Sequence, residues 1–336
     1  MEVDDRDRGD RPNESWILAM ILIISHLADV HATTVLQHLV RSRIDAVLFD
    51  TARFPREIRL DMTHASVTRS RASAVIDGVR RDLSAVRAVW WRRPQPFDIQ
   101  VEVTGGEDRG FAYGECQAAM SGLWSCLDAH WVNNPGRDEV AARKVYQLKI
   151  ASELGFRVPR TLVTNDPDSA AAFIDAEGAA GTIYKAFSAT ERAWRETRLL
   201  KPQERTQLDA VRFAPVIFQE HIRADIDLRI TMVGDKIFPA EILSGETDYH
   251  VDFRMTMHAA TIRPHVLPDE VVKKLHAFME ALGLVYGAID MRLTPDGEYV
   301  FLEINPAGQW LFIEERTGQP ITAALAEHLT VCDTRA

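Results

Sequence analysis

Three side chains near the end of the chain have the chemistry of a divalent-cation site. Glu303 and Asn305 are two residues apart in the run YVFLEIN, so in a β-strand they point to the same face. Asp290 lies in the preceding run GAIDMRL, and a hairpin would bring its carboxylate beside the other two. Mg²⁺ is usually held by one or two carboxylates together with the phosphates of its substrate. These residues therefore predict a Mg²⁺ site, and the alternative is the exposed polar face of an edge hairpin.

The elements that must position this site are two strands joined by a tight turn. Both runs are rich in β-forming residues, and Pro295-Asp296-Gly297 between them is a typical turn sequence. An antiparallel hairpin over residues 286–305 is therefore expected.

Two lysines further upstream suit the phosphate oxygens of a nucleotide. Lys185 is expected in an apolar strand, where a lysine is rarely buried without a partner, and Lys144 lies on a predicted helix. A lysine ammonium is a compact point charge, which suits phosphate oxygens. For Lys144 a solvated helix face is the alternative.

The segment FQEHI, residues 218–222, is a candidate connector for binding adenine. It runs from an apolar strand into polar chain, so its main-chain N–H and C=O groups could meet the edge of a base, with Glu220 reaching a polar base or ribose atom. Asp227 could accept from ribose hydroxyls and Arg229 could clamp phosphate, and the alternative is a cross-strand ion pair. The other connector residues expected at the nucleotide are Gln219, His221 and Ile222.

A long loop contains a second cluster of charged residues. Asp252 and Arg254 lie there, with His250 nearby. Loops on rigid scaffolds often carry functional residues, although charged loop residues are also common on every protein surface. The loop is therefore a candidate part of the site.

Length and composition restrict the class of protein. The chain has 336 residues, enough for roughly two to three structural units, and its 46% hydrophobic and 26% charged residues are typical of a soluble globular enzyme. The net charge of -10 argues against nucleic acid as a partner. No apolar run is long enough to span a membrane, and three cysteines without metal-ligand spacing predict a reduced, cytoplasmic setting.

The chain in order predicts an α/β unit followed by helices and mixed strands. Residues 1–19 are charged and poor in large apolar groups, so a disordered extension is expected there. An apolar strand from Met20, an amphipathic helix and a second apolar strand then form a βαβ unit with parallel strands. Residues 137–155 are expected to form one long helix.

A strand that ends in Trp90, Trp91, Arg92 and Arg93 is a second place where binding residues are expected. In open α/β sheets such residues tend to lie just beyond the carboxyl ends of strands. The two tryptophans are expected to pack, and the two arginines to mark the edge of a site.

The sequence lacks the motifs of several other enzyme classes. It has no GxxxxGKS/T phosphate loop and no GxGxxG after a strand, and GxSxG, HExxH and CxxC arrangements are also missing. The specific signal is the order of the candidate residues along the chain: Lys, Lys, QE, DLR, DFR and then D…ExN.

That order resembles the ATP-grasp superfamily, and the likeness covers about residues 20–330. The resemblance implies a mixed α/β and α+β fold in which two lobes hold ATP behind a smaller N-terminal domain. The expected units are the disordered extension (1–19), an N-terminal parallel α/β domain (20–135), a central lobe (136–217) and a C-terminal catalytic lobe (218–331).

The resemblance also implies roles for the candidate residues. Lys144 and Lys185 match the two lysines that contact the nucleotide phosphates, with Lys149 as the rival of Lys144. FQEHI is similar to the connector that holds adenine, and DLR to the strand that contacts ribose or phosphate. The residues that match the Mg²⁺ ligands are Asp290, Glu303 and Asn305.

Four strings resemble, more narrowly, the ATP-grasp peptide maturases of the microviridin (graspetide) type: VWWRRP, QLKIASELGFRVPRTLVTNDP, VDFR and FLEINPAGQWLFIEERTGQPI. The most specific is EINPAGQW with the TG-x-PI helix start that follows it. Many ATP-grasp enzymes cover the phosphates with a glycine-bearing loop, whereas residues 186–200 contain no glycine. The maturases also tend to be poor in glycine there.

The resemblance implies an ADP-forming ligase that uses ATP and Mg²⁺. It would activate an Asp or Glu side chain of a ribosomally made precursor peptide, leader plus core, as an acyl phosphate. A Ser/Thr hydroxyl (ω-ester) or a Lys amine (ω-amide) would then displace phosphate and close a macrocycle. Arg229 and Arg254 would stabilise the transferring phosphoryl group and the oxyanion, and Asp252 or His250 is the candidate general base.

Two other functions stay open on the sequence alone. One is a ligase that adds free amino acids to a peptide or protein terminus, as polyglutamate ligases do. The other is a non-catalytic ATP-binding protein, against which the intact D…ExN triad argues. The motifs do not identify the precursor, the ring pattern, the choice of ester or amide, or the oligomeric state, a homodimer included.

Overall fold

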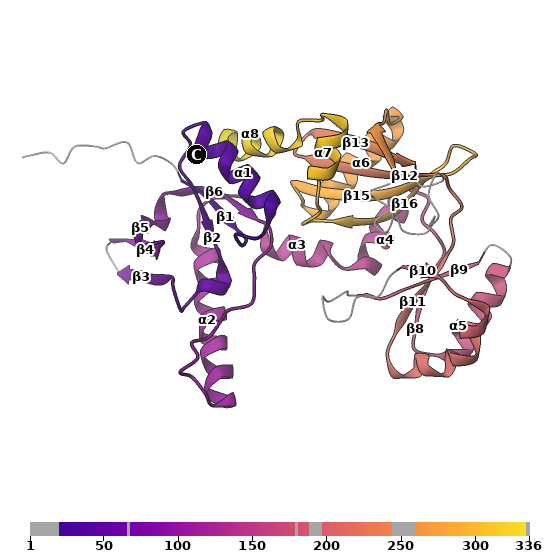
Figure 1. The fold of residues 1–336 in the computed structure, drawn as a ribbon, viewed down its shortest axis with the longest axis horizontal. Helices are drawn as coiled ribbons and strands as arrows, with labels where there is room; N and C mark the ends of the chain where they lie inside the picture. Colours follow the sequence, from indigo (N-terminus) through magenta and orange to yellow (C-terminus); the bar gives the residue numbers. More distant parts are fainter. Residues whose placement is uncertain (1–19, 66–67, 179–180, 188–196, 244–259, 334–336) are drawn as a thin grey trace, which may run out of the picture.

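The computed structural model describes residues 20–65, 68–178, 181–187, 197–243 and 260–333 (Figure 1). The expected extension at residues 1–19, residues 188–196 of the glycine-free segment and the loop with His250, Asp252 and Arg254 lie outside these ranges. No helix within these ranges is long and apolar enough to cross a membrane.

A four-stranded parallel sheet forms from the first part of the chain. Its order is β2-β1-β6-β7, and every neighbouring pair is parallel. The strands are β1 (Met20–Ile24), β2 (Ala46–Phe49), β6 (Val86–Trp91) and β7 (His130–Val132). β1 is buried along its whole length, as a continuous apolar run in a covered parallel sheet should be, and α1 (Val30–Arg41) packs on one face. The predicted βαβ unit is confirmed.

Further elements surround this sheet. β3 (Arg59–Ala65), β4 (Thr68–Ile76) and β5 (Val79–Asp82) form a separate antiparallel sheet, and α2 (Gly106–Cys126) covers the second face of the parallel one. Two short 3₁₀ helices are η1 (Thr51–Arg53) and η2 (Leu83–Ala85).

The central part of the chain forms a second four-stranded sheet in the order β10-β9-β11-β8. Its strands are β8 (Thr161–Thr164), β9 (Thr182–Lys185), β10 (Arg198–Leu199) and β11 (Val216–Glu220), and α5 (Pro167–Glu177) and the 3₁₀ helix η4 (Pro202–Phe213) pack against it. Both neighbours of β11 belong to this sheet. Because the expected boundary between residues 217 and 218 falls inside β11, we propose that the central unit extends through this strand.

A five-stranded antiparallel sheet forms the last part, in the order β14-β13-β12-β15-β16. Its strands are β12 (Ile226–Val233), β13 (Lys236–Leu243), β14 (Thr261–Pro264), β15 (Tyr286–Leu293) and β16 (Tyr299–Asn305). The helices are α3 (Pro135–Ala141), α4 (Lys144–Glu153), α6 (Asp269–Leu282), α7 (Leu311–Thr317) and α8 (Ile321–Asp333). α4 and α6 cover one face, and α8 lies between the other face and the parallel sheet, so both sheets share one apolar core (Figure 1).

The predicted hairpin at the end of the chain is confirmed. β15 and β16 are antiparallel neighbours, and the Gly297 N–H donates to the Thr294 carbonyl at 2.9 Å across the turn. Gly297 has a φ of 83°, a left-handed conformation that glycine adopts without strain. The turn residues therefore act as their types predict.

The single helix expected over residues 137–155 is two helices, α3 and α4. Arg143 between them has an extended backbone, with φ -77° and ψ 104°. The Gln147 amide donates to the Ala141 carbonyl at the end of α3, at 2.7 Å. It also donates to the Ile304 carbonyl at 2.9 Å, and its Oε1 accepts from the Ile304 N–H at 3.0 Å. The prediction was wrong because these partners of a buried glutamine lie on β16, which helical periodicity does not reveal.

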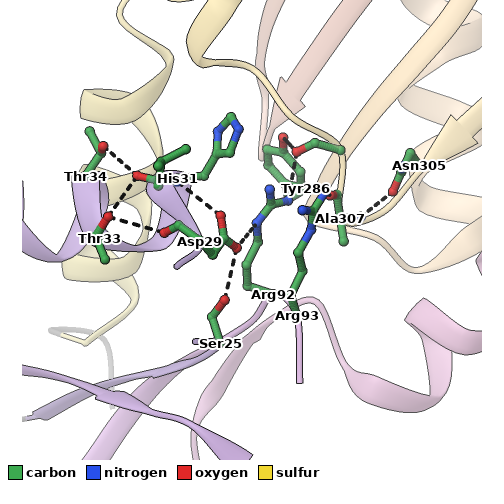
Figure 2. A network of polar contacts seen from close by, with 12 residues as sticks. Ser25, Asp29, His31, Thr33, Thr34, Arg92, Arg93, Tyr286, Asn305 and Ala307 are labelled. Atoms are coloured by element: carbon green, nitrogen blue, oxygen red, sulfur yellow. Dashed lines mark hydrogen bonds and ion pairs between the residues drawn. The ribbon is translucent and has the colours of Figure 1, made fainter. Parts of the chain in front are cut away.

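A buried arginine joins the parallel sheet to the segment that follows β16 (Figure 2). Arg92 lies just beyond β6 and is 2% exposed. Its Nε donates to Asp29 Oδ2 at 3.2 Å, and its Nη1 donates to the Gly308 carbonyl at 2.8 Å. The guanidinium carbon is 5.3 Å from the centre of the Trp310 ring. We call Arg92 with Asp29 and Gly308 the Arg92 clamp.

Further contacts fix the same segment. Arg93 Nη2 donates to the Ala307 carbonyl at 3.4 Å, and the Tyr286 hydroxyl donates to the Gly308 carbonyl at 2.8 Å. A Cβ at position 308 would lie 2.2 Å from the Ala288 Cβ. Only glycine fits this position, because the chain runs directly against β15.

Gly308→Ala is expected to lower the free energy of unfolding by about 1–3 kcal/mol or more, because the added methyl overlaps the Ala288 side chain. Urea unfolding followed by circular dichroism measures this difference. The matched control is Gly110→Ala on α2, where a Cβ meets nothing within 4 Å. The control should be neutral or stabilising, since alanine is the better helix former. A Gly308→Ala protein as stable as the wild type would contradict the close packing.

His31 predicts a pH dependence of stability. It is 4% exposed, its Nδ1 has no hydrogen-bond partner among the residues described, and its ring centre lies 4.5 Å from that of Trp310. Burial, and next the charge of Arg92, lowers the pKa of His31 from 6.5 to about 3. Between these values the unfolded chain binds a proton that the folded chain does not, so this group lowers stability as the pH falls below 6.5.

His31→Phe is therefore expected to be more stable relative to wild type at about pH 5 than at about pH 8, by about 2 kcal/mol. Unfolding curves at both pH values measure the difference. His38→Gln, on the exposed face of the same helix, is the control and should show no such change. Equal pH profiles for His31→Phe and wild type would count against a neutral buried imidazole.

Candidate active site

Most of the predicted nucleotide and metal residues line one pocket between the central sheet and the C-terminal sheet. The predicted residues in its lining are Lys185, Gln219, Glu220, His221, Ile222, Asp227, Asp290 and Glu303. Lys185 is 8% exposed at the end of β9, the connector begins within β11 and continues past its end at Glu220, and the acids come from β12, β15 and β16. The pocket lining thus comes from three strands of the C-terminal sheet and two strands of the central sheet.

A β-bulge in β16 shapes one wall of this pocket. The register pairs Asp290 with Glu303 and then shifts, which leaves Leu302 as an extra residue. Leu302 and Glu303 both line the pocket, while Ile304 packs in the core beneath. Asp290 and Glu303 are therefore direct cross-strand neighbours, as the predicted hairpin requires.

Two D-x-R triplets face each other across β12 and β15. The antiparallel register places Asp227 opposite Arg292 and Arg229 opposite Asp290. Arg292 Nε donates to Asp227 Oδ1 at 2.8 Å, and Arg229 Nη1 donates to Asp290 Oδ1 at 2.6 Å. The cross-strand ion pair considered for the DLR triplet is therefore present, and its partners come from β15.

Both acids of the predicted metal set contact a cation. Lys144, the first residue of α4, places its Nζ 2.8 Å from Glu303 Oε2, and Arg229 contacts Asp290. Arg229 Nη2 also donates to the Gln309 carbonyl at 3.2 Å, while its buried Nε has no hydrogen-bond partner in the described part of the chain. The rival lysine, Lys149, contacts Glu153 on the exposed side of α4. Of the two lysines, Lys144 is the one that contacts a residue of the pocket, although it is not itself in the lining.

Asn305 lies at the exposed end of β16. Its Oδ1 accepts from the Ala307 N–H at 2.9 Å, and it is not among the pocket-lining residues (Figure 2). Among the described residues, no group of three or more His, Cys, Asp or Glu is placed to hold a metal ion. The candidate set is two carboxylates and one amide oxygen, all hard donors that match the preference of Mg²⁺. The cations already beside Asp290 and Glu303 show that this corner favours positive charge.

The connector is held through its side chains on one side. Gln219 Nε2 donates to Thr161 Oγ1 at 2.8 Å. The Glu220 carboxylate accepts from Arg157 Nη2 at 2.9 Å and from the Arg160 N–H at 3.0 Å. The Glu220 side chain therefore already has partners within the protein. The main-chain groups of the connector remain as the candidates for contact with a base.

Arg292 is a residue of the pocket lining that the sequence did not lead us to predict. Besides Asp227 it contacts the Ile222 carbonyl, to which its Nη1 donates at 2.7 Å. It thereby fixes the far end of the connector from the C-terminal sheet. A signal was available: DMR at 290–292 repeats the spacing of DLR at 227–229, and two such triplets on antiparallel neighbours place each Asp opposite an Arg.

Comparisons with known proteins give a consistent result. Residues 20–139 match the family described as the MvdD pre-ATP grasp domain. The structure is similar to macrocyclase MdnC bound with precursor peptide MdnA from Microcystis aeruginosa MRC, at 30% identity and a TM-score of 0.82, over 92% of this chain and 99% of that one. No curated protein sequence matches the chain.

Two further solved structures are similar over nearly their whole length. One is a RiPP-associated ATP-grasp ligase from Chryseobacterium gregarium in complex with ADP and a leader and core peptide, at 26% identity and a TM-score of 0.85, over 94% of this chain and 99% of that one. The other is macrocyclase MdnB from Microcystis aeruginosa MRC, at 28% identity and a TM-score of 0.78, over 92% and 98%. The expected ATP-grasp fold is confirmed.

Arg292→Met is expected to destabilise the protein by about 3–5 kcal/mol, because it leaves the buried Asp227 carboxylate without its partner. The double variant Asp227→Leu with Arg292→Met should be closer to wild type, since no buried charge remains. Denaturant unfolding of all three proteins measures both values. Arg80→Met, which breaks an exposed pair with Asp61, is the control and should change stability by about 1 kcal/mol or less. A double variant as unstable as Arg292→Met would contradict this account.

Proposed function

The chain belongs to the ATP-grasp ligases that modify ribosomally made precursor peptides, and on that premise we propose that it closes macrocycles within such a peptide. It uses ATP to activate Asp or Glu side chains of the core, and joins them to Ser/Thr hydroxyls as ω-esters or to Lys amines as ω-amides. The leader segment of the same precursor is its binding partner.

The strongest support for this proposal is that acidic and basic side chains lie together at one pocket. Asp290 and Glu303 meet there from neighbouring strands, with Lys185 in the same lining and Arg229 in contact with Asp290. A nucleotide triphosphate with its metal needs both signs of charge at once, because cations hold its phosphates and carboxylates hold the metal.

The proposed reaction has two steps. A carboxylate oxygen of the peptide attacks the γ-phosphate of ATP, ADP leaves, and an acyl phosphate forms on the peptide. A hydroxyl or amine of the same peptide then attacks the acyl carbon, its proton passes to a base, and phosphate leaves. The peptide therefore loses one water per bond, while ATP ends as ADP and phosphate.

We assign the protein groups as follows. Lys144 and Lys185 bind phosphate oxygens, and the main chain of residues 219–222 meets the base. Arg229 is poised to stabilise the transferring phosphoryl group, which the buried and unpartnered Nε supports. Further candidates for the catalytic groups are Asp252, Arg254 and His250, which lie outside the described residues.

The metal ligands of the proposal are Asp290, Glu303 and Asn305. Mg²⁺, when bound, neutralises phosphate charge and so lowers the repulsion that a carboxylate meets on approaching ATP. The bulge at Leu302 holds Glu303 opposite Asp290, and the Arg92 clamp fixes the chain directly after Asn305. We further propose a reduced, cytoplasmic setting, which is consistent with the free thiols of Cys116 and Cys126.

Incubation of the protein with ATP, Mg²⁺ and the precursor peptide encoded beside its gene is expected to lower the peptide mass by one water per bond and to release ADP. Mass spectrometry and an ADP assay measure both. Glu303→Gln should reduce the rate about a hundredfold or more, since one such electrostatic contact is worth about 2.7–4 kcal/mol in the barrier. Glu298→Gln, an exposed acid on the same hairpin, is the matched control and should keep activity.

Several results would contradict the proposal. A gain in peptide mass would indicate addition of free amino acids, and turnover without ATP would exclude this chemistry. Full activity of Glu303→Gln would remove the metal assignment while leaving the reaction class in place.

A further inference from the structure

A groove in the N-terminal part of the chain is lined by aromatic side chains. We call it the aromatic groove; its rings are Trp91, Phe97, Tyr113, Trp124 and Trp131. It lies where β6 and β7 end, between the chain leaving β6, the helix α2 and the start of α3. The carboxyl end of a parallel sheet is where open α/β folds usually bind ligands.

The three tryptophans of the groove form one cluster of rings set at steep angles. Trp91 and Trp124 have ring centres 6.1 Å apart at 75°, and Trp124 and Trp131 are 6.5 Å apart at 80°. All three are only partly buried, and Tyr113 beside them is 36% exposed. In such edge-to-face contacts the edge of one ring meets the face of the next, and the ring surface that still lines the groove can bind an organic cation.

The charges of the groove point to the same kind of ligand. Among the residues that the structure describes, its lining contains two acids, Asp138 and Glu139, and no Lys, Arg or His. Asp138 Oδ1 is buried and has no hydrogen-bond partner within the described ranges. Burial raises the pKa of Asp138 to about 6, while a hydrogen bond with the Asn133 side chain and the charge of Arg92 act in the opposite direction. A positively charged group in the groove would complement the two acids and the rings.

The groove is connected to the candidate active site through the chain that leaves β6. Trp91 and Pro94 line the groove, while Arg92 and Arg93 between them contact the carbonyls of Gly308 and Ala307. On its other side, α3 with Asp138 leads into α4, which begins with Lys144. Two stretches of chain thus connect the groove to the residues that we assign to catalysis.

We propose that the aromatic groove binds a lysine or arginine side chain of the precursor peptide, outside the bonds that are formed. The assignment rests on the proposed function for the identity of the peptide. The aliphatic stem packs on the tryptophan rings, and the cationic head lies at Asp138. A neutral apolar side chain would lack the attraction to the two acids, and an acidic one would be repelled.

The test is a titration of the full-length protein, without ATP, with the peptide acetyl-Gly-Lys-Gly-amide, followed by tryptophan fluorescence. A saturable change is expected, and the norleucine analogue, which has a similar stem without charge, should bind about tenfold more weakly. Asp138→Asn should remove the preference for lysine with little change in shape. Glu153→Gln, an exposed acid on α4, is the matched control and should bind as wild type does.

A second measurement links the groove to the precursor. An excess of the lysine peptide should raise the KM for the precursor and leave the KM for ATP unchanged. Equal binding of the lysine and norleucine peptides, or an unchanged preference in Asp138→Asn, would overturn the proposal. Binding without competition would also overturn it, because the groove would then serve another ligand. Since probe binding needs neither ATP nor turnover, failure of the proposed ligase reaction would be seen separately, in the mass assay.

Discussion

The buried guanidinium of Arg92 is the polar contact that joins the parallel sheet to the chain after the five-stranded sheet. A charge removed from water has to be met by opposite charge and by dipoles, and here Asp29, the Gly308 carbonyl and the Trp310 ring meet it. These partners come from the chain after β1 and from the chain after β16. Strand order reverses between β1 and β6, where open α/β sheets usually bind a ligand. In this protein the segment around Gly308 occupies that crevice.

The candidate active site follows from a second arrangement of buried charge. The D-x-R triplets of β12 and β15 neutralise each other in pairs, so four ionised side chains can lie on one face of a sheet without net charge. One pair holds the connector through Ile222, and the other places Asp290 beside Glu303. The same two strands therefore position residues that we propose for the nucleotide and for the metal.

The sequence predicted the elements whose signals are local. The buried strand from Met20, the helix that follows it and the turn at Gly297 could be read from apolar runs and turn residues, and the family resemblance implied the fold that the comparisons confirm. What could not be read depends on partners distant in the chain. The break before Lys144 depends on contacts of Gln147 with β16, and the bulge at Leu302 depends on register. The position of Arg292 at the pocket was not predicted, although its triplet DMR has the same spacing as the earlier triplet DLR.

Gln147, which lies close to the break between α3 and α4, also bears on how the molecule behaves in solution. β16 is the last strand of its sheet, and a last strand exposes unpaired N–H and C=O groups that can recruit another chain. Gln147 donates to and accepts from the main chain of Ile304 as a neighbouring strand would, and the Phe301 N–H donates to the Arg157 carbonyl. The helix α4 and the chain after it thus act as a cover for the edge, which protects this sheet against edge-to-edge aggregation.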